Sequence, residues 1–146
     1  MNIQIHNRLP TTEEFVALRS GVSWGTPTAI HAQQALKASI AGVTASVDGK
    51  TVGMARAVGD GVLNTYIQDV IVAEPYQKRG IGDQLVSTLI DSLSETNNPN
   101  CLIGLFAADG QDTFYTRFGF MARPQFGFGP GMHGTLSDLA KARGAA

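Results

Sequence analysis

An apolar run that leads into a cationic, glycine-containing loop and then into a helix is the feature that most constrains the fold of this chain. The run Val70–Val72 predicts a strand, and the amphipathic pattern that follows predicts a helix from about Gly82 to Glu95. The start of a helix presents backbone N–H groups without helical partners and the positive end of the helix dipole. Gly80 lets an anion approach the backbone closely, and Lys78 and Arg79 add full positive charges. The sequence therefore predicts an anion-binding junction between a strand and a helix.

Two common nucleotide-binding loops do not fit this junction. The P-loop pattern G-x-x-x-x-G-K-[ST] is absent from the sequence. A dinucleotide-binding fingerprint requires a third glycine where Leu85 stands. Its turn also follows the strand almost at once, whereas residues Ala73–Arg79 intervene here. The junction is therefore expected to bind an anion of another kind.

Two motifs of the chain match one enzyme family. The segment Gln77–Gly82 fills the pattern Q-x-x-G-x-G, and Phe114–Phe120 fills F-Y-x-x-x-G-F downstream of it. In these motifs the sequence resembles the GCN5-related N-acetyltransferases, whose Q-x-x-G-x-G loop binds the pyrophosphate of acetyl-CoA. The resemblance extends from about Ala45 to Met121. Within the family, three further runs are similar to small bacterial members and chloroplast-type serotonin acetyltransferases, namely Ala55–Ala57, Ile67–Val70 and Gly129–Met132.

Length and composition are typical of one globular domain. A chain of 146 residues can bury about two thirds of its unfolded surface, and 43% of these residues are hydrophobic. The formal net charge of −1 gives no bulk attraction to nucleic acid or to an anionic membrane, so neither partner is expected. The single cysteine, Cys101, excludes an internal disulfide and the usual zinc clusters, and it is predicted to be an inert buried thiol. We expect a cytoplasmic protein without a bound metal, since no signal-peptide pattern or membrane-spanning run is present.

The N-terminal half predicts a strand, two helices and an antiparallel meander. Residues Met1–Arg8 alternate as a short strand does, and Thr11–Glu14 offer a capping box for a helix that reaches Arg19. A second helix is expected from about Pro27 to Leu36. Asp-Gly pairs, which favour tight hairpins, then separate three strand-like runs, Ile40–Val47, Thr51–Val58 and Val62–Val72.

The C-terminal half predicts the remainder of an α+β domain. The helix after the loop should end at the Asn-rich segment that begins with Asn97, and the apolar run Cys101–Phe106 suits a strand parallel to the one before the helix. Asp112–Phe118 is predicted to be a short helix, and Phe120 onward a final strand and loop. These elements predict a single domain, residues 1–146, with a mixed, mostly antiparallel sheet flanked by helices. The resemblance implies the same fold.

The resemblance also implies that acetyl-CoA is the co-substrate, and it indicates which residues bind it. The pantetheine arm would pair with main-chain groups of the strand, and the pyrophosphate would lie on the loop and the first helical turn. The strand residues are Val70, Ile71 and Val72. The loop and helix residues are Gln77, Lys78, Arg79, Gly80, Ile81, Gly82 and Asp83, and the last would contribute chiefly its N–H because its carboxylate weakly opposes the phosphates.

Tyr115 is the candidate general acid, because it occupies the tyrosine position of the second motif. A phenol is protonated near neutral pH and can donate a proton to the leaving thiolate. The general base is unresolved, since Tyr66 stands where some family members have a glutamate. Strand alternation places Tyr66, Gln68 and Val70 on one face and Asp69 on the other. A structural hydrogen bond is the expected role of Asp69, unless a bulge reorients it toward the reaction.

The acceptor side is expected to be lined by Trp24 and Phe128, with Tyr66 and Gln68 from the strand. An apolar and aromatic lining favours a small primary amine with a hydrophobic body over a polyamine. The sequence thus predicts direct acetyl transfer to a small amine in a ternary complex. Two alternatives stay open, namely acetylation of a protein or peptide amine and a non-catalytic acyl-CoA-binding regulatory module. Homodimer formation is also left open.

Overall fold

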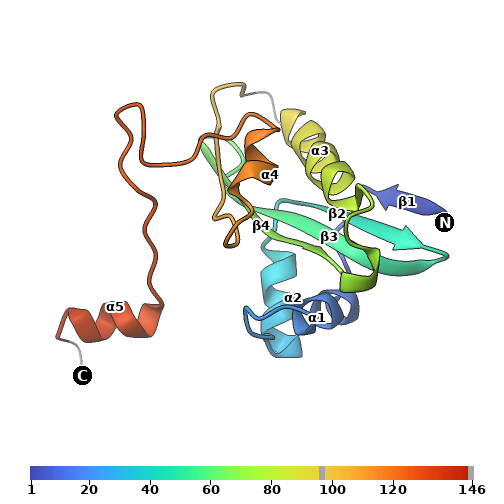
Figure 1. Cartoon of the computed structure of the whole chain (residues 1–146). Coiled ribbons are helices and arrows are strands. Elements are labelled where there is room, and N and C mark those ends of the chain that lie inside the picture. The colour runs from blue at the N-terminus through green and yellow to red at the C-terminus, as the bar shows by residue number, and fades with distance from the viewer. Residues whose placement is uncertain (96–97, 145–146) are drawn as a thin grey trace. The chain divides into compact units, whose positions relative to one another are not determined.

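The computed structural model describes residues 1–95 and 98–144, so the start of the predicted Asn-rich segment, Asn97, lies outside the described residues. The chain divides into two compact units, Met1–Leu105 and Phe106–Ala146. Figure 1 shows the helices and strands of both units and labels most of them. None of the described helices is long and apolar enough to cross a membrane.

A five-stranded sheet forms the framework of the first unit, in the order β1-β2-β3-β4-β5. The first four strands form an antiparallel meander, whereas β5 pairs in parallel with β4. This mixed, mostly antiparallel sheet confirms the predicted α+β fold class. The strands are β1 (Ile3–His6), β2 (Ala41–Val47), β3 (Lys50–Gly59), β4 (Asn64–Val72) and β5 (Leu102–Gly104).

The two Asp-Gly pairs form tight connections, as the sequence predicts. Asp48 (φ 50°) and Gly49 (φ 80°) both adopt the left-handed conformation that a two-residue hairpin turn requires. At the next turn, the Asp60 carboxylate accepts hydrogen bonds from three successive backbone N–H groups of residues 62–64, at 2.7 to 3.0 Å. These local turns set the register of the meander.

Two helices, α1 (Thr12–Ser20) and α2 (Ala29–Lys37), cover one face of the sheet. Phe15 of α1 is 1% exposed and lies in a buried cluster with Met54 of β3 and Ile71 of β4. The start of α1 is the predicted capping box, which satisfies backbone N–H groups at the helix terminus. The buried cluster anchors the helical pair over the middle of β3 and the end of β4.

Helix α3 (Ile81–Ser94) lies across the sheet from α1 and α2 (Figure 1). Its predicted apolar stripe is buried. A Cβ atom at Gly53 of β3 would lie only 3.1 Å from a side-chain carbon of Leu85, so the helix packs directly on the strand there. This close packing holds the start of α3, and hence the loop before it, against the sheet. The stripe consists of Ile81, Leu85, Val86, Leu89 and Leu93.

The second unit contains two short helices, α4 (Asp112–Thr116) and α5 (Leu136–Ala142). The final strand predicted from Phe120 onward is wrong, because in the described part of this unit the strand pairing is limited to an isolated bridge between Gln125 and Phe128. Several glycines and prolines interrupt the stretch, and both residue types disfavour a continuous strand. α5 has no counterpart among the predicted elements.

Candidate functional site

The loop between β4 and α3 has the conformation that an anion-binding junction needs. A short 3-10 turn at Glu74–Tyr76 leads into it, and Gly80 (φ 78°) caps α3 in the left-handed conformation that glycine adopts without strain. Among the side chains that the structure describes, none caps this helix start. The first helical hydrogen bond runs from Gln84 N–H to the Gly80 carbonyl oxygen at 3.2 Å, so the N–H groups of Ile81 and Gly82 precede it. These two groups are oriented as donors to an anion at the helix start.

The two cationic side chains of the loop, Lys78 and Arg79, are exposed and therefore accessible to a phosphate. Lys78 has a left-handed backbone (φ 59°), and its side chain lies at the surface. Arg79 donates weakly from Nη2 to the Pro75 carbonyl oxygen at 3.3 Å. Asp83 is partly exposed in the first turn of α3, where a carboxylate favours the helix dipole but weakly opposes a bound phosphate. Lys78 and Arg79 thus concentrate positive charge at the loop, although the formal net charge of the chain is only −1.

The outer edge of β4 is covered over only part of its length. β5 pairs with β4 at Asn64–Tyr66 and ends at Gly104, so it is shorter than the predicted run Cys101–Phe106. Within the described residues of the first unit, the stretch Ile67–Val72 has a partner strand on one side, β3, and none on the other. An extended ligand can therefore pair with the main chain of this stretch, which includes the predicted pantetheine-binding residues.

A bulge interrupts β4 within that stretch, at Asp69. Arg56 pairs with Gln68 whereas Met54 pairs with Ile71, so β4 has one more residue than β3 between these two pairs. Asp69 lies in the bulge with a left-handed backbone (φ 57°). Arg56 and Gln68 are directly paired, so their side chains share a face of the sheet. The extra residue shifts the alternation after Gln68, and the Asp69 side chain therefore binds that of Arg56. The prediction that Asp69 faces away from Gln68 is wrong for this reason.

The Asp69 carboxylate is the centre of a buried ion-pair cluster. Its side chain is 0% exposed; Oδ1 lies 2.8 Å from Nη1 of Arg19, and Oδ2 lies 2.5 Å from Nε of Arg56. Both guanidinium groups also lie within 6 Å of the centre of the Phe15 ring. Because each carboxylate oxygen accepts a hydrogen bond from a guanidinium group, the Asp69 side chain is engaged in a structural cluster. The role expected from the sequence, a structural one, agrees with this geometry.

Sequence reasoning missed the two arginines of this cluster. The available signal was Arg56 within the apolar strand, since a buried strand tolerates a charge only when an opposite charge faces it. Asp69 is the acidic residue of the neighbouring apolar strand. Arg19 lies near the end of α1 and gave no such signal, because a cation in the last helical turn is ordinary.

The structure brings three of the predicted acceptor residues to one face of the first unit. Tyr66 and Gln68 pair with Val58 and Arg56 of β3, so they lie on the face that α1 and α2 cover. Trp24 lies between these two helices, and its carbonyl oxygen is 3.4 Å from Nη2 of Arg19, the arginine that binds Asp69. Trp24 is thus linked to the bulge of β4 through one side chain.

Tyr115 and Phe128 belong to the second unit, and their roles remain predictions. Tyr115 is half-buried; its ring packs edge-on against Phe114 at 4.9 Å and against Phe120 at 6.2 Å between centroids. Burial raises the pKa of the Tyr115 phenol above its usual value near 10, so the hydroxyl stays protonated at neutral pH. The Phe128 ring is 46% exposed, and the Arg123 guanidinium lies 4.7 Å from its centre.

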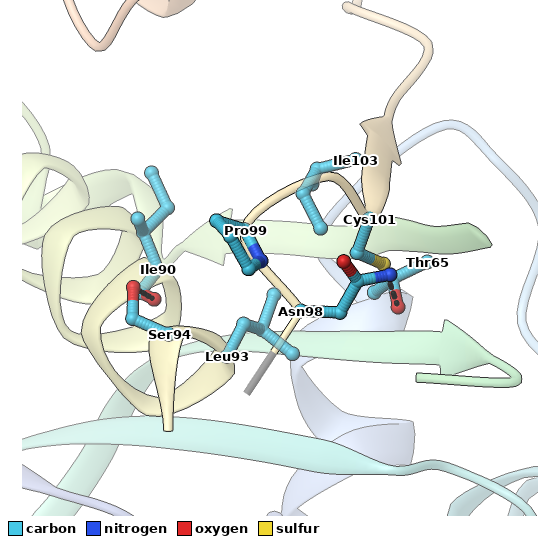
Figure 2. A pocket seen from close by; sticks show the side chains of 8 residues that line it. All are labelled: Thr65, Ile90, Leu93, Ser94, Asn98, Pro99, Cys101 and Ile103. Carbon is cyan, nitrogen blue, oxygen red and sulfur yellow. Dashed lines mark hydrogen bonds between the residues drawn. The ribbon is translucent and has the colours of Figure 1, made fainter. Parts of the chain in front are cut away.

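A cavity of about 300 Å³ lies at the other end of β4 from the glycine loop (Figure 2). It opens between the end of α3 and the starts of β4 and β5, and Cys101 lines it with its Sγ 3.7 Å from Oγ1 of Thr65. Thr65 and Val72 stand near opposite ends of β4, so this cavity is separate from the junction at the glycine loop. Cys101 is partly exposed rather than buried as predicted.

The sequence and the fold of this chain both match acetyltransferases. A family model described as an acetyltransferase (GNAT) domain matches residues 16–127, or 112 of 146. Histone acetyltransferase TAP1 of Glycine max is 40% identical over 76 residues, which are 52% of this chain and 32% of that protein. The chloroplastic serotonin N-acetyltransferase 2 of Oryza sativa subsp. japonica is 36% identical over 76 residues, 52% of this chain and 37% of that protein. This chain therefore spans about a third of the length of these relatives.

A solved structure extends the match over nearly the whole chain. The crystal structure of a probable acetyltransferase from meticillin-resistant Staphylococcus aureus superposes with a TM-score of 0.81 and 25% sequence identity, covering 92% of this chain and 99% of that one. The family model and this structural match agree. This protein belongs to the GNAT family of acetyltransferases.

Proposed function

We propose that this protein transfers the acetyl group of acetyl-CoA directly to a primary amine of a small molecule, in a ternary complex. The observation that supports this most is the stretch of β4 between its bulge and the glycine loop, whose outer edge is uncovered within the described part of the first unit. An extended pantetheine arm would pair there as an added strand does. The start of α3, with its left-handed Gly80, follows directly and fits a pyrophosphate.

The main chain of Val70–Val72 is assigned two tasks in the transfer. Its C=O and N–H groups orient the thioester, and one N–H stabilises the negative charge that develops on the carbonyl oxygen. The amine nitrogen forms a bond to the acetyl carbon, and the bond from that carbon to sulfur breaks. The Tyr115 hydroxyl then donates a proton to the departing thiolate, and its raised pKa ensures that this proton is present at neutral pH.

Water, rather than a carboxylate of β4, is assigned as the group that accepts the proton of the amine. Both oxygens of Asp69 already accept from guanidinium groups, and Tyr66 replaces the glutamate that some family members have on this strand. The amine would therefore react in its neutral form, and the rate should rise with pH until the free amine is deprotonated. If the pH at which the rate levels off follows the pKa of the amine from one substrate to the next, this assignment is supported. A constant apparent pKa across amines of different basicity would instead indicate a base on the enzyme.

We assign the acceptor of the acetyl group to one class of compounds, the primary amines with a hydrophobic or aromatic body. Trp24 stands half-exposed near the bulge of β4, and the one acidic side chain at that bulge, Asp69, is neutralised by two arginines. A polyamine would require several free carboxylates. The rice relative, which is named a serotonin N-acetyltransferase, is consistent with this class. Release of free CoA thiol should therefore be faster with arylalkylamines than with spermidine, and efficient use of spermidine alone would contradict the assignment.

Acetylation of a protein amine is the second candidate, because the relative from Glycine max is named a histone acetyltransferase. The same thiol-release assay separates the candidates when histone-tail peptides and peptides with free N-termini are included. Turnover of peptides but not of arylalkylamines would mean that the acceptor is a protein amine and not a small molecule. Binding of CoA without turnover of any amine would instead support the acyl-CoA-binding regulatory module.

A further inference from the structure

Arg19 links the bulge of β4 to the connection between α1 and α2. Its Nη1 atom lies 2.8 Å from Oδ1 of Asp69, and its Nη2 atom donates to the carbonyl oxygens of Gly25 at 2.8 Å and Trp24 at 3.4 Å. The Asp69 side chain is fully buried, whereas Trp24 is half-exposed. One side chain therefore fixes an exposed aromatic segment relative to a buried position of the sheet.

A guanidinium suits this link because it donates in two directions at once. Its five N–H donors lie in one plane, so one edge can bind the Asp69 carboxylate while another atom binds the backbone of residues 24–25. A lysine at position 19 would place one ammonium opposite Asp69 on a flexible stem. It would keep the charge pair but lose the simultaneous hold on the backbone carbonyls.

The anchor at the other end of the link is rigid. Arg56 binds the second oxygen of Asp69 and also donates from Nη1 to Oγ of Ser39 at 3.1 Å. Asp69 has a left-handed backbone (φ 57°), which non-glycine residues adopt only when their surroundings hold them there. Removal of the Arg19 side chain leaves Asp69 paired with Arg56, so such a variant can keep the buried charge balanced.

We propose that Arg19 is a positioning residue for the amine acceptor. It holds Trp24 beside the uncovered stretch of β4, where Val70–Val72 would present the thioester. This inference rests on the proposed function. The hydrogen bonds described for the Arg19 side chain go to Asp69 and to the backbone at positions 24–25, away from the glycine loop. Loss of Arg19 should therefore impair recognition of the amine and spare that of acetyl-CoA.

The position of Trp24 can be measured without any assay of activity, because Trp24 is the only tryptophan in the sequence. Arg19→Met and Arg19→Lys should both increase the quenching of its fluorescence by acrylamide, since its backbone is released. Arg8→Met is the matched control, because it removes a partly exposed ion pair with Glu14 at the start of the same helix and should leave the quenching unchanged. Quenching at the wild-type level in folded Arg19→Met protein would overturn the proposal.

Steady-state kinetics with the best amine then test the positioning role. Both Arg19 variants should raise KM for the amine by about tenfold or more, with KM for acetyl-CoA within about twofold of wild type. Arg19→Lys should also keep a melting temperature close to wild type, which separates the loss of positioning from a loss of stability. Equal increases in both KM values, or full rescue by lysine, would contradict the proposal. If wild-type protein acetylates no amine, the proposed function fails, and the fluorescence experiment still decides whether Arg19 holds Trp24.

Discussion

The side-chain amide of Gln77 donates a hydrogen bond to the carbonyl oxygen of Val72, 2.8 Å away. This bond joins the loop before α3 to the last residue of β4. On the other side of the strand end, the Ala73 N–H donates to the Val52 carbonyl oxygen at 2.8 Å. The stretch proposed to pair with the pantetheine arm and the loop proposed to receive the pyrophosphate are thus held in one fixed arrangement.

Gln77→Leu removes this hydrogen bond while keeping a side chain of similar length. A single hydrogen bond contributes about 1 kcal/mol, so the dissociation constant of CoA should rise by about fivefold. Isothermal titration calorimetry measures the change. Gln34→Leu, at an exposed position of α2, is the control and should bind CoA as wild type does. Equal CoA affinities of the two variants would show that CoA binding does not depend on the hydrogen bond between Gln77 and Val72.

Tyr115→Phe tests the assignment of the general acid, because it deletes a hydroxyl and keeps the aromatic packing with Phe114 and Phe120. We expect kcat to fall by about tenfold or more, with the dissociation constant of CoA within a few-fold of wild type. Phe118→Leu, which alters packing in the same segment without removing a proton donor, serves as the comparison. A wild-type kcat for Tyr115→Phe would mean that the thiolate leaves without its help.

The local part of this site follows from the sequence. Gly80 close to Lys78 and Arg79, between an apolar run and an amphipathic helix, is a signal confined to a few neighbouring residues. The structure has the predicted helix start there, with Gly80 in the left-handed conformation. The Asp-Gly turns and the capping box of α1 are equally local. Local hydrogen bonding and backbone sterics determine such features, so a single sequence is sufficient to predict them.

The bulge at Asp69 could not be predicted in the same way. The sequence around it alternates regularly, and the extra residue is recognised only when β3 and β4 are paired. The link from Arg19 to Trp24 likewise depends on how α1 packs on the sheet. The final strand expected from Phe120 failed because isolated apolar residues between glycines resemble a strand in pattern but do not form one.

Asp69→Asn tests the structural role of the buried cluster. It leaves two partly buried guanidinium groups without the buried anion between them, so the free energy of unfolding should decrease by about 3 kcal/mol. Urea denaturation measures this change. Arg8→Met removes a partly exposed ion pair and should cost less than about 1 kcal/mol. A loss for Asp69→Asn no larger than that of the control would contradict the structural role.

Glu14 should contribute to the acid sensitivity of the fold. The hydrogen bond from Arg8 is the main cause that lowers the Glu14 pKa to about 2, with further bonds from Thr51 and the Thr11 backbone. A carboxyl whose pKa is depressed on folding stabilises the protein above its unfolded pKa of about 4.5, and this contribution is lost as pH falls toward about 2. The difference in melting temperature between wild type and Glu14→Gln should therefore be greatest near pH 7 and shrink below about pH 5. A difference that is independent of pH would contradict this linkage.

Binding of CoA to the loop is the central claim, and calorimetric titration of CoA into wild type, Gly82→Ala and Gly82→Glu tests it most directly. Gly82→Ala adds a methyl group alone, whereas Gly82→Glu adds a negative charge in the first turn of α3, which suits the helix dipole but repels a bound pyrophosphate. The account predicts micromolar-range or tighter binding by wild type and an affinity at least about tenfold lower for Gly82→Glu, equivalent to about 1.4 kcal/mol. Identical CoA affinity in the wild type and in folded Gly82→Glu would contradict it.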